Sequence, residues 1–251
     1  MERDTAAGRD TVGHGFALAG LAGSGIAVVL VLGLTLTVGQ VDPIRRTISE
    51  YALLDGVKPV FDTGVLAFAA AVLCVLVALV RAGLVRSASG ASAGLVLAAV
   101  GLGAVVVFEK TNWAVGPSVG GTIHRYASLV AFLALPIAAI LVVRRFRRAA
   151  AVGPEPRPGA RHAGWTRWLA VVSLLWFTPI LVGFAQRPFT GVSWWRAVPL
   201  GLVERGLALT EVLVLVALAV WGLTAARRTP VAPPAPEAVG DSRIPREMSR
   251  D

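Results

Sequence analysis

The sequence predicts an all-α membrane protein, a bundle of six transmembrane helices with both termini in the cytoplasm. Three observations support this prediction. Of the 251 residues, 55% are hydrophobic and only 16% are charged, whereas an average soluble domain has about a quarter charged residues. Six apolar stretches approach or exceed the length of about 20 residues that a helix needs to cross the hydrocarbon layer. Basic residues gather in alternate loops, which indicates how the helices are oriented.

The six predicted helices follow one another through residues 16–223, which form the transmembrane domain. None of the stretches alternates polar and apolar residues with a period of two, so a β-barrel is not indicated. The first stretch is too long for the apolar region of a secretory signal peptide and lacks a clear cleavage site, so we expect it to be retained as a helix. The predicted ranges are 16–38, 63–80, 90–108, 126–143, 168–185 and 198–223.

The segments outside these helices are polar. Residues 1–15 form a predicted cytoplasmic N-terminal segment, and residues 224–251 form a cytoplasmic tail that is rich in proline and charge. Residues 150–164, between the fourth and fifth helices, have a similar composition. Neither this linker nor the tail can bury enough apolar surface to offset chain entropy. Both are therefore predicted to be disordered.

The distribution of charge predicts the orientation. With six passes, the termini and the second and fourth loops share one side, which holds 16 of the 24 Lys and Arg residues and 8 of the 15 acidic residues. That side therefore carries +8 of the net charge of +9. The positive-inside rule places it in the cytoplasm, with the chain in the cell inner (plasma) membrane. The charge indicates topology and attraction to anionic lipids at the cytoplasmic face, rather than binding to nucleic acid.

Small residues are spaced for close helix packing. The third helix opens with Gly90-x-x-x-Gly94 and continues with Gly101, while the first helix contains Gly20 and Gly23. Such residues allow the backbones of neighbouring helices to approach. The pattern is compatible with packing inside the bundle and equally with a homo-oligomer.

The first outer loop contains a predicted short amphipathic helix. Asp42 followed by Pro43 is a helix-start signal. If the helix continues, Ile44, Ile48 and Tyr51 share one face, and Arg46 with Glu50 forms an i,i+4 pair on the opposite face. This pattern is typical of a helix that lies in the membrane plane. It predicts a lid or anchor, with a ligand contact as the alternative.

The third outer loop holds the candidate acid or base. His124 is the only histidine expected at the outer face, and imidazole can exchange protons near neutral pH. Glu109 or Glu204 is its candidate catalytic partner. A hydrogen-bonded histidine that caps the bundle explains the sequence as well. Catalytic zinc sites use three protein ligands, which this loop does not supply, so neither a metal nor another cofactor is predicted.

The last helix carries ionisable groups inside its apolar stretch. Glu204 and Glu211 are seven residues apart, so they share a face, and Glu211 lies about 10 Å deeper. An ionisable residue at that depth marks a pathway or site, or, as a neutral acid, donates a hydrogen bond to another helix. Arg205 is a candidate ligand for an anionic head group, or a partner of other outer-face groups.

Three short motifs carry a resemblance to a known family. Residues 49–53 read SEYAL, residues 120–127 read GGTIHRYA and residues 201–206 read GLVERG. In this order they resemble a family of bacterial six-pass membrane proteins called domain of unknown function 998. The resemblance spans about residues 16–223 and implies six helices with polar positions at Ser49, His124 and Arg205. Members often carry Asp after Phe-Pro in the third outer loop, where this chain has Phe108-Glu109-Lys110.

The polar residues map to the outer side, which predicts an outward-facing polar pocket. The first reading is a non-enzymatic protein that binds or moves a small solute or lipid. The second is a scaffold or assembly factor without a substrate, and the third is an intramembrane enzyme that acts on a lipid-linked substrate with His124 as acid or base. The candidate residues are Ser49, Glu50, Tyr51, Glu109, His124, Arg125, Glu204, Arg205 and Glu211.

Overall fold

The computed structural model describes residues 2–112, 114–152 and 159–226, and these residues are all-helical, without a β-strand. Six helices are long and apolar enough to cross a membrane, the fifth being formed by α5 and α6 together. The predicted all-α fold with six helices that can span a membrane is therefore confirmed. The elements are α1 (Glu2–Thr37), the 3₁₀ helix η1 (Ile48–Leu53), α2 (Lys58–Arg81), α3 (Gly90–Val107), α4 (Val119–Val152), α5 (Ala160–Leu175), α6 (Thr178–Thr190), α7 (Trp194–Ala197) and α8 (Leu200–Ala226).

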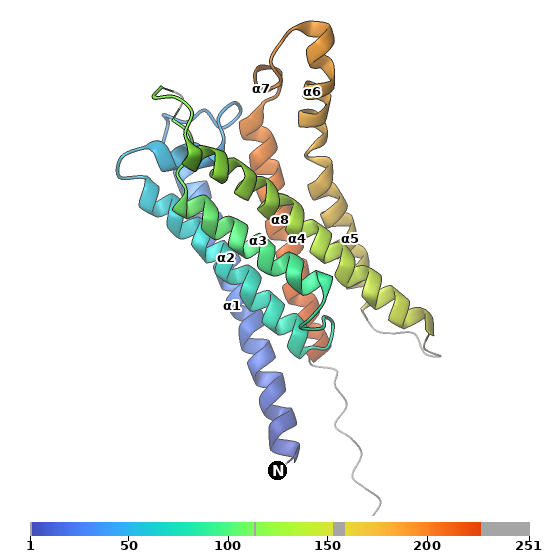
Figure 1. The fold of residues 1–251 in the computed structure, drawn as a ribbon. Coiled ribbons are helices and arrows are strands. Elements are labelled where there is room, and N and C mark those ends of the chain that lie inside the picture. The colour runs from blue at the N-terminus through green and yellow to red at the C-terminus, as the bar shows by residue number, and fades with distance from the viewer. Residues whose placement is uncertain (1, 113, 153–158, 227–251) are drawn as a thin grey trace, which may run out of the picture.

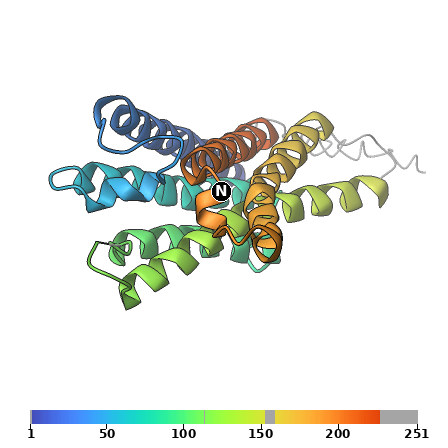
Figure 2. The same cartoon turned by 90° about the horizontal axis from the view of Figure 1, so that it is seen from above.

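The spans form a closed ring. The contacts follow the order α1, α2, α3, α4, α5, α8 and return to α1, and α8 also touches α2 across the ring. Figure 1 shows the long helices side by side, and Figure 2 shows α8 lying beside α1, the first span. We call the end of the bundle that carries residues 38–57, 108–118 and 191–199 the upper end, as drawn in Figure 1, and the opposite end the lower end.

Small residues bring neighbouring helices close together. On α1, Gly20 and Gly23 pack against Ala71 of α2. On α3, Gly94 lies against Ala138 of α4. Gly101 lies against Ala127 and Ala131, which are nearer the start of α4. These glycines leave no room for a side chain, so the predicted small-residue pattern is used inside the bundle.

Two apolar clusters form the core. The larger one runs through the middle and lower parts of the bundle and includes Val75, Leu135 and Leu218. The smaller one lies at the upper end, where Tyr51 and Phe61 pack against Val105. The loop between α1 and α2 is thus part of the core rather than an addition to it.

The helix boundaries differ from the predicted ones at charged segments. Helix α1 begins at Glu2, inside the predicted N-terminal segment, and α4 extends in both directions beyond 126–143. The linker predicted over 150–164 is shorter, because α4 ends at Val152 and α5 begins at Ala160. Residues 153–158 of the linker and 227–251 of the predicted tail lie outside the described residues.

The short helix predicted in the first outer loop is present as η1, a six-residue 3₁₀ helix. Ile48 and Tyr51 point into the upper apolar cluster, whereas Ile44 is exposed. The three residues therefore do not share one apolar face. The expected ion pair between Arg46 and Glu50 forms at 2.8 Å.

The fifth span is broken near its middle. The α-helical ladder stops at Trp176 and Phe177, whose amides make 3₁₀-type bonds to Ser173 and Leu174. Pro179 then occupies the first turn of α6, where its missing N–H leaves no unsatisfied donor. Above this break α6 and the short α7 form a hairpin that extends beyond the other helices (Figure 1).

Candidate functional site

The guanidinium group of Arg205 joins the start of α8 to the loop between α1 and α2. Its Nη1 donates hydrogen bonds to the carbonyl oxygens of Arg46 at 2.8 Å, Pro43 at 3.0 Å and Gly201 at 3.3 Å. Its Nη2 donates to the Tyr51 hydroxyl at 3.2 Å, and the guanidinium carbon lies 5.9 Å from the centre of that ring. One side chain therefore binds the loop at Pro43 and Arg46 and again at Tyr51.

Three further contacts fix the same loop on α8. The Glu204 carboxylate accepts a hydrogen bond from the Ile48 amide at 2.6 Å. The Leu202 amide donates to the Ile44 carbonyl at 2.9 Å. Gly201 lets the two backbones touch, since a methyl group there would lie 2.6 Å from the Pro43 carbonyl oxygen. We define the loop 1 latch as residues 201, 202, 204 and 205 of α8 together with residues 43–51 of the loop.

Lys110 adds the loop between α3 and α4 to this cluster. Its ammonium group donates to Glu50 at 3.3 Å and also to the Thr47 hydroxyl. Thr47 and Ser49 exchange a hydrogen bond at 3.1 Å. Sequence reasoning chose Glu109 for this loop, but Glu109 is exposed and its neighbour makes the contact. The sequence contains one signal that could have pointed to Lys110, which is its rarity: Lys110 is one of only two lysines among the 24 basic residues.

Glu50 is held between two cations. Burial works to raise the pKa of its carboxyl, but the hydrogen bond from Arg46 and the charge of Lys110 outweigh burial and lower the pKa below the ordinary value of 4.5. Since the folded-state pKa lies below the unfolded one, the ionised carboxylate stabilises the fold above about pH 4.5. This stabilisation is lost as the pH falls further.

Replacement of Glu50 by glutamine is therefore expected to lower the unfolding temperature at neutral pH, and the difference from wild type should shrink below pH 4.5. Thermal unfolding of the purified protein across this pH range measures the effect. The control is Glu109→Gln, which changes an exposed carboxyl and should leave the unfolding temperature unchanged. A Glu50→Gln difference that stays constant with pH would contradict the assignment.

His124 ties the start of α4 to the end of α3. Its Nδ1 lies 2.8 Å from the Phe108 carbonyl oxygen and 3.1 Å from that of Val105. Carbonyl oxygens only accept hydrogen bonds, so Nδ1 carries the proton and Nε2 is the free acceptor. That atom is buried and has no hydrogen-bond partner among the described residues. This geometry matches the capping role weighed for His124, and no hydrogen bond between described residues joins the His124 ring to Glu109.

The structure brings together only part of the predicted set. Ser49, Glu50, Tyr51, Glu204 and Arg205 meet in and around the loop 1 latch.

The remaining candidates lie apart. Arg125 is exposed on α4, and Glu211 is buried in α8 with one carboxyl oxygen that has no partner among the described residues. The described residues contain no group of three side chains suited to hold a metal ion.

A family model described as "Protein of unknown function (DUF998)" matches residues 21–221. The chain belongs to the DUF998 family. No curated protein and no solved structure matches it. In this DUF998 protein the matched region runs from within α1 to near the end of α8, so it includes at least part of each of the six spans.

The three motifs behind the family resemblance are contact points between segments. SEYAL and GLVERG meet in the loop 1 latch, where Tyr51 touches Arg205. GGTIHRYA places His124 against the end of α3, and its Gly121 packs closely on Thr111 of the third outer loop. Each motif therefore helps to fix the upper end of the DUF998 bundle.

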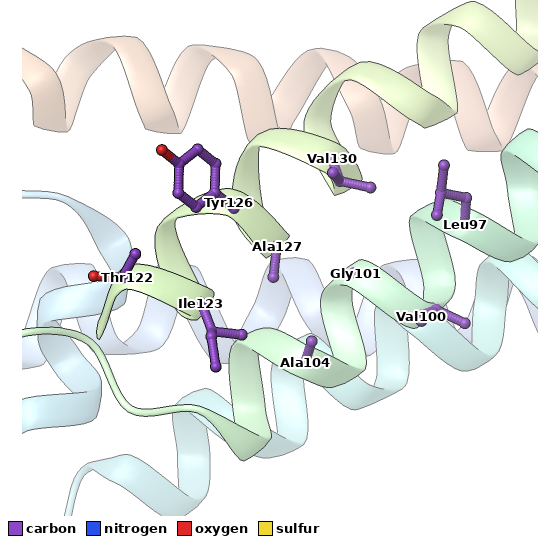
Figure 3. Close-up of a pocket in the computed structure, with 9 residues that line it drawn as sticks. All are labelled: Leu97, Val100, Gly101, Ala104, Thr122, Ile123, Tyr126, Ala127 and Val130. Atoms are coloured by element: carbon purple, nitrogen blue, oxygen red, sulfur yellow. The ribbon is translucent and has the colours of Figure 1, made fainter. Parts of the chain in front are cut away.

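A groove opens between α3 and α4 in the upper half of this DUF998 protein. It has a volume of about 350 Å³. Thr122 and Tyr126 lie at one end of the groove, and Leu97 and Val130 lie at the other (Figure 3). The lining residues are Leu97, Val100, Gly101, Ala104, Thr122, Ile123, Tyr126, Ala127 and Val130.

Proposed function

We propose that this DUF998 protein binds a membrane lipid, with the acyl chain in the groove between α3 and α4. The observation that carries the proposal is the groove itself, because almost every atom of its lining is apolar and it lies on a span of the bundle. An acyl chain packs against such a surface by van der Waals contact.

The direction of the groove also fits a lipid. Its two hydroxyl-bearing residues, Thr122 and Tyr126, lie in the first turns of α4, near the upper end. Val130 lies about 12 Å beyond Thr122 along the helix at a rise of 1.5 Å per residue. The two hydroxyl groups add almost nothing to the apolar lining, but they lie at the end of the groove where the head group of a bound phospholipid would lie.

A lipid fits better than a polar solute. A solute site needs polar groups that converge on an empty space. Here the charged groups already have partners within the protein. Glu50 accepts a hydrogen bond from Lys110, and Glu204 accepts one from a backbone amide. Arg205 donates to a backbone carbonyl. Of the two ligand classes predicted from the sequence, a small solute and a lipid, we therefore propose the lipid.

The scaffold function is the second candidate, and the loop 1 latch favours it. The polar residues of the three motifs fix segments of the bundle to each other, as expected if their role is to set helix register. A scaffold needs no preferred lipid. The labelling experiment below separates the two candidates.

We also propose the plasma membrane as the location, with both termini in the cytoplasm. At the lower end the described side chains include Arg81, Arg86, the four arginines between 144 and 148, Arg161 and Arg167. At the upper end acidic and basic groups are mixed. This asymmetry supports a cytoplasmic lower end.

Replacement of Ala104 by phenylalanine is expected to fill the groove and to reduce lipid labelling there several-fold. A phospholipid with a photoreactive group in its acyl chain is crosslinked to the protein in liposomes, and peptides are mapped by mass spectrometry. Wild type should be labelled preferentially between 97 and 104 and between 122 and 130.

The control is Leu66→Phe, which adds the same ring to an exposed position on α2. It should leave the labelling at α3 and α4 unchanged. Even labelling of all membrane-facing helices in wild type would overturn the lipid proposal and favour the scaffold. Both variants are checked for an unchanged unfolding temperature before labelling.

A further inference from the structure

We propose a binding site for the head group of an anionic phospholipid on α5 at the lower end of the bundle. The site consists of Arg161, Gly164, Trp165 and Trp168, which line a hollow of about 420 Å³. It lies on a different helix and at the opposite end from the groove between α3 and α4. The inference therefore stands independently of the proposed function.

The four residues form one face of α5. Their spacing of i, i+3, i+4 and i+7 places them in a stripe along the helix. The rings of Trp165 and Trp168 meet edge to face with their centres 5.9 Å apart, and both are more than half exposed, at 57% and 56%. Gly164 has no atom near the position of a side chain, which leaves the space between Arg161 and the rings open.

The polarity along this face follows that of a phospholipid. Arg161 lies at the lower end of α5, the two tryptophans come next, and Val171 and Leu175 continue as exposed apolar residues. From Arg161 to Leu175 the helix rises about 21 Å. Tryptophan favours the level of the head groups, and arginine binds phosphate through paired N–H donors. The stripe thus offers a cation, an aromatic zone and an apolar zone in that order.

The charge of the surroundings selects an anionic lipid. The described side chains of the lower end include eight arginines, and Arg161 forms no ion pair with a described residue. This differs from the upper end, where Arg46, Lys58 and Lys110 are paired with carboxylates. The arginines of the lower end therefore favour a head group with net negative charge over a zwitterionic one.

The test compares phosphatidylglycerol with phosphatidylcholine on the full-length protein. The protein is purified in detergent, incubated with equimolar amounts of the two lipids, and analysed by native mass spectrometry. Wild type should retain phosphatidylglycerol in preference to phosphatidylcholine. Arg161→Gln is expected to reduce that preference about five-fold, which corresponds to about 1 kcal/mol.

The matched control is Arg167→Gln, because Arg167 lies on the same helix and is exposed but does not line the hollow. It should keep the wild-type preference. A double variant, Trp165→Ala with Trp168→Ala, should lose retention of phosphatidylglycerol even though the charge is unchanged.

Three results would overturn the site. One is an equal loss in Arg161→Gln and Arg167→Gln, which would show a diffuse effect of surface charge. Another is equal retention of the two lipids by wild type. The third is competition by inorganic phosphate as effective as that by the lipid, since the two tryptophans would then play no part.

Discussion

Replacing Arg205 with alanine is expected to lower the free energy of unfolding by about 3 kcal/mol, because hydrogen bonds from a charged donor contribute about 1.5–3 kcal/mol and several share this group. The change removes the donors for the Pro43 and Arg46 carbonyls and for the Tyr51 hydroxyl. Chemical or thermal unfolding of the purified protein in detergent measures the loss. Arg205→Lys should restore only part of it, because one ammonium group cannot reproduce the planar fork of donors.

Two controls define the origin of this effect. Arg45→Ala removes a neighbouring exposed arginine and is expected to change stability by less than about 0.5 kcal/mol. Tyr51→Phe combined with Arg205→Ala completes a double-mutant cycle, which should show coupling of about 1 kcal/mol if the two side chains interact. An Arg205→Ala loss no larger than that of Arg45→Ala would refute the role of the latch.

Gly201→Ala is expected to destabilise the protein by about 2 kcal/mol through overpacking. The added methyl group would lie 2.6 Å from the Pro43 carbonyl oxygen and 2.9 Å from the Arg46 amide nitrogen, and it would also overlap the Arg46 carbonyl. These neighbours are backbone atoms, so they cannot rotate away as a flexible side chain would. The loop between α1 and α2 must therefore move off α8, which also stretches the hydrogen bonds of Arg205.

Gly103→Ala is the matched control for this substitution. Gly103 also lies in a helix, but no atom lies within 4 Å of the position of its added methyl group. Alanine favours the helix over glycine by about 1 kcal/mol, so this variant should be as stable as wild type or more so. The same unfolding measurement compares the two. Equal effects of the two substitutions would show that Gly201 is not a close-contact position.

The membrane architecture could be predicted because hydropathy reports directly on the solvent around each helix. The six spans follow from apolar length alone, whereas their boundaries do not. The segment before Tyr126 is rich in glycine and polar residues, which lowers its hydropathy, yet α4 already begins at Val119. At its other end the helix continues through the arginines after Val143, since a helix does not end where the bilayer does.

The polar contacts could be predicted only where they are local. The Arg46–Glu50 pair follows from helical spacing, and it forms although η1 begins only at Ile48. The bond between Arg205 and Tyr51 joins residues 154 positions apart, and no periodicity reports on such a contact. For the same reason Lys110 was missed, because its partner Glu50 lies 60 positions earlier. The break at Trp176 had a local signal in Pro179 that hydropathy does not register.

The ring order of the spans has a consequence for the time course of biogenesis. The first span has the last of the six, α8, as a neighbour, so the ring stays open while the spans between them are translated and inserted. During that interval the Pro43 and Arg46 carbonyls can be hydrated, because their loop lies at the membrane surface. Insertion of α8 brings Arg205 to this loop and closes the ring. A chain truncated before Leu200 would keep an open bundle that quality-control proteases can recognise.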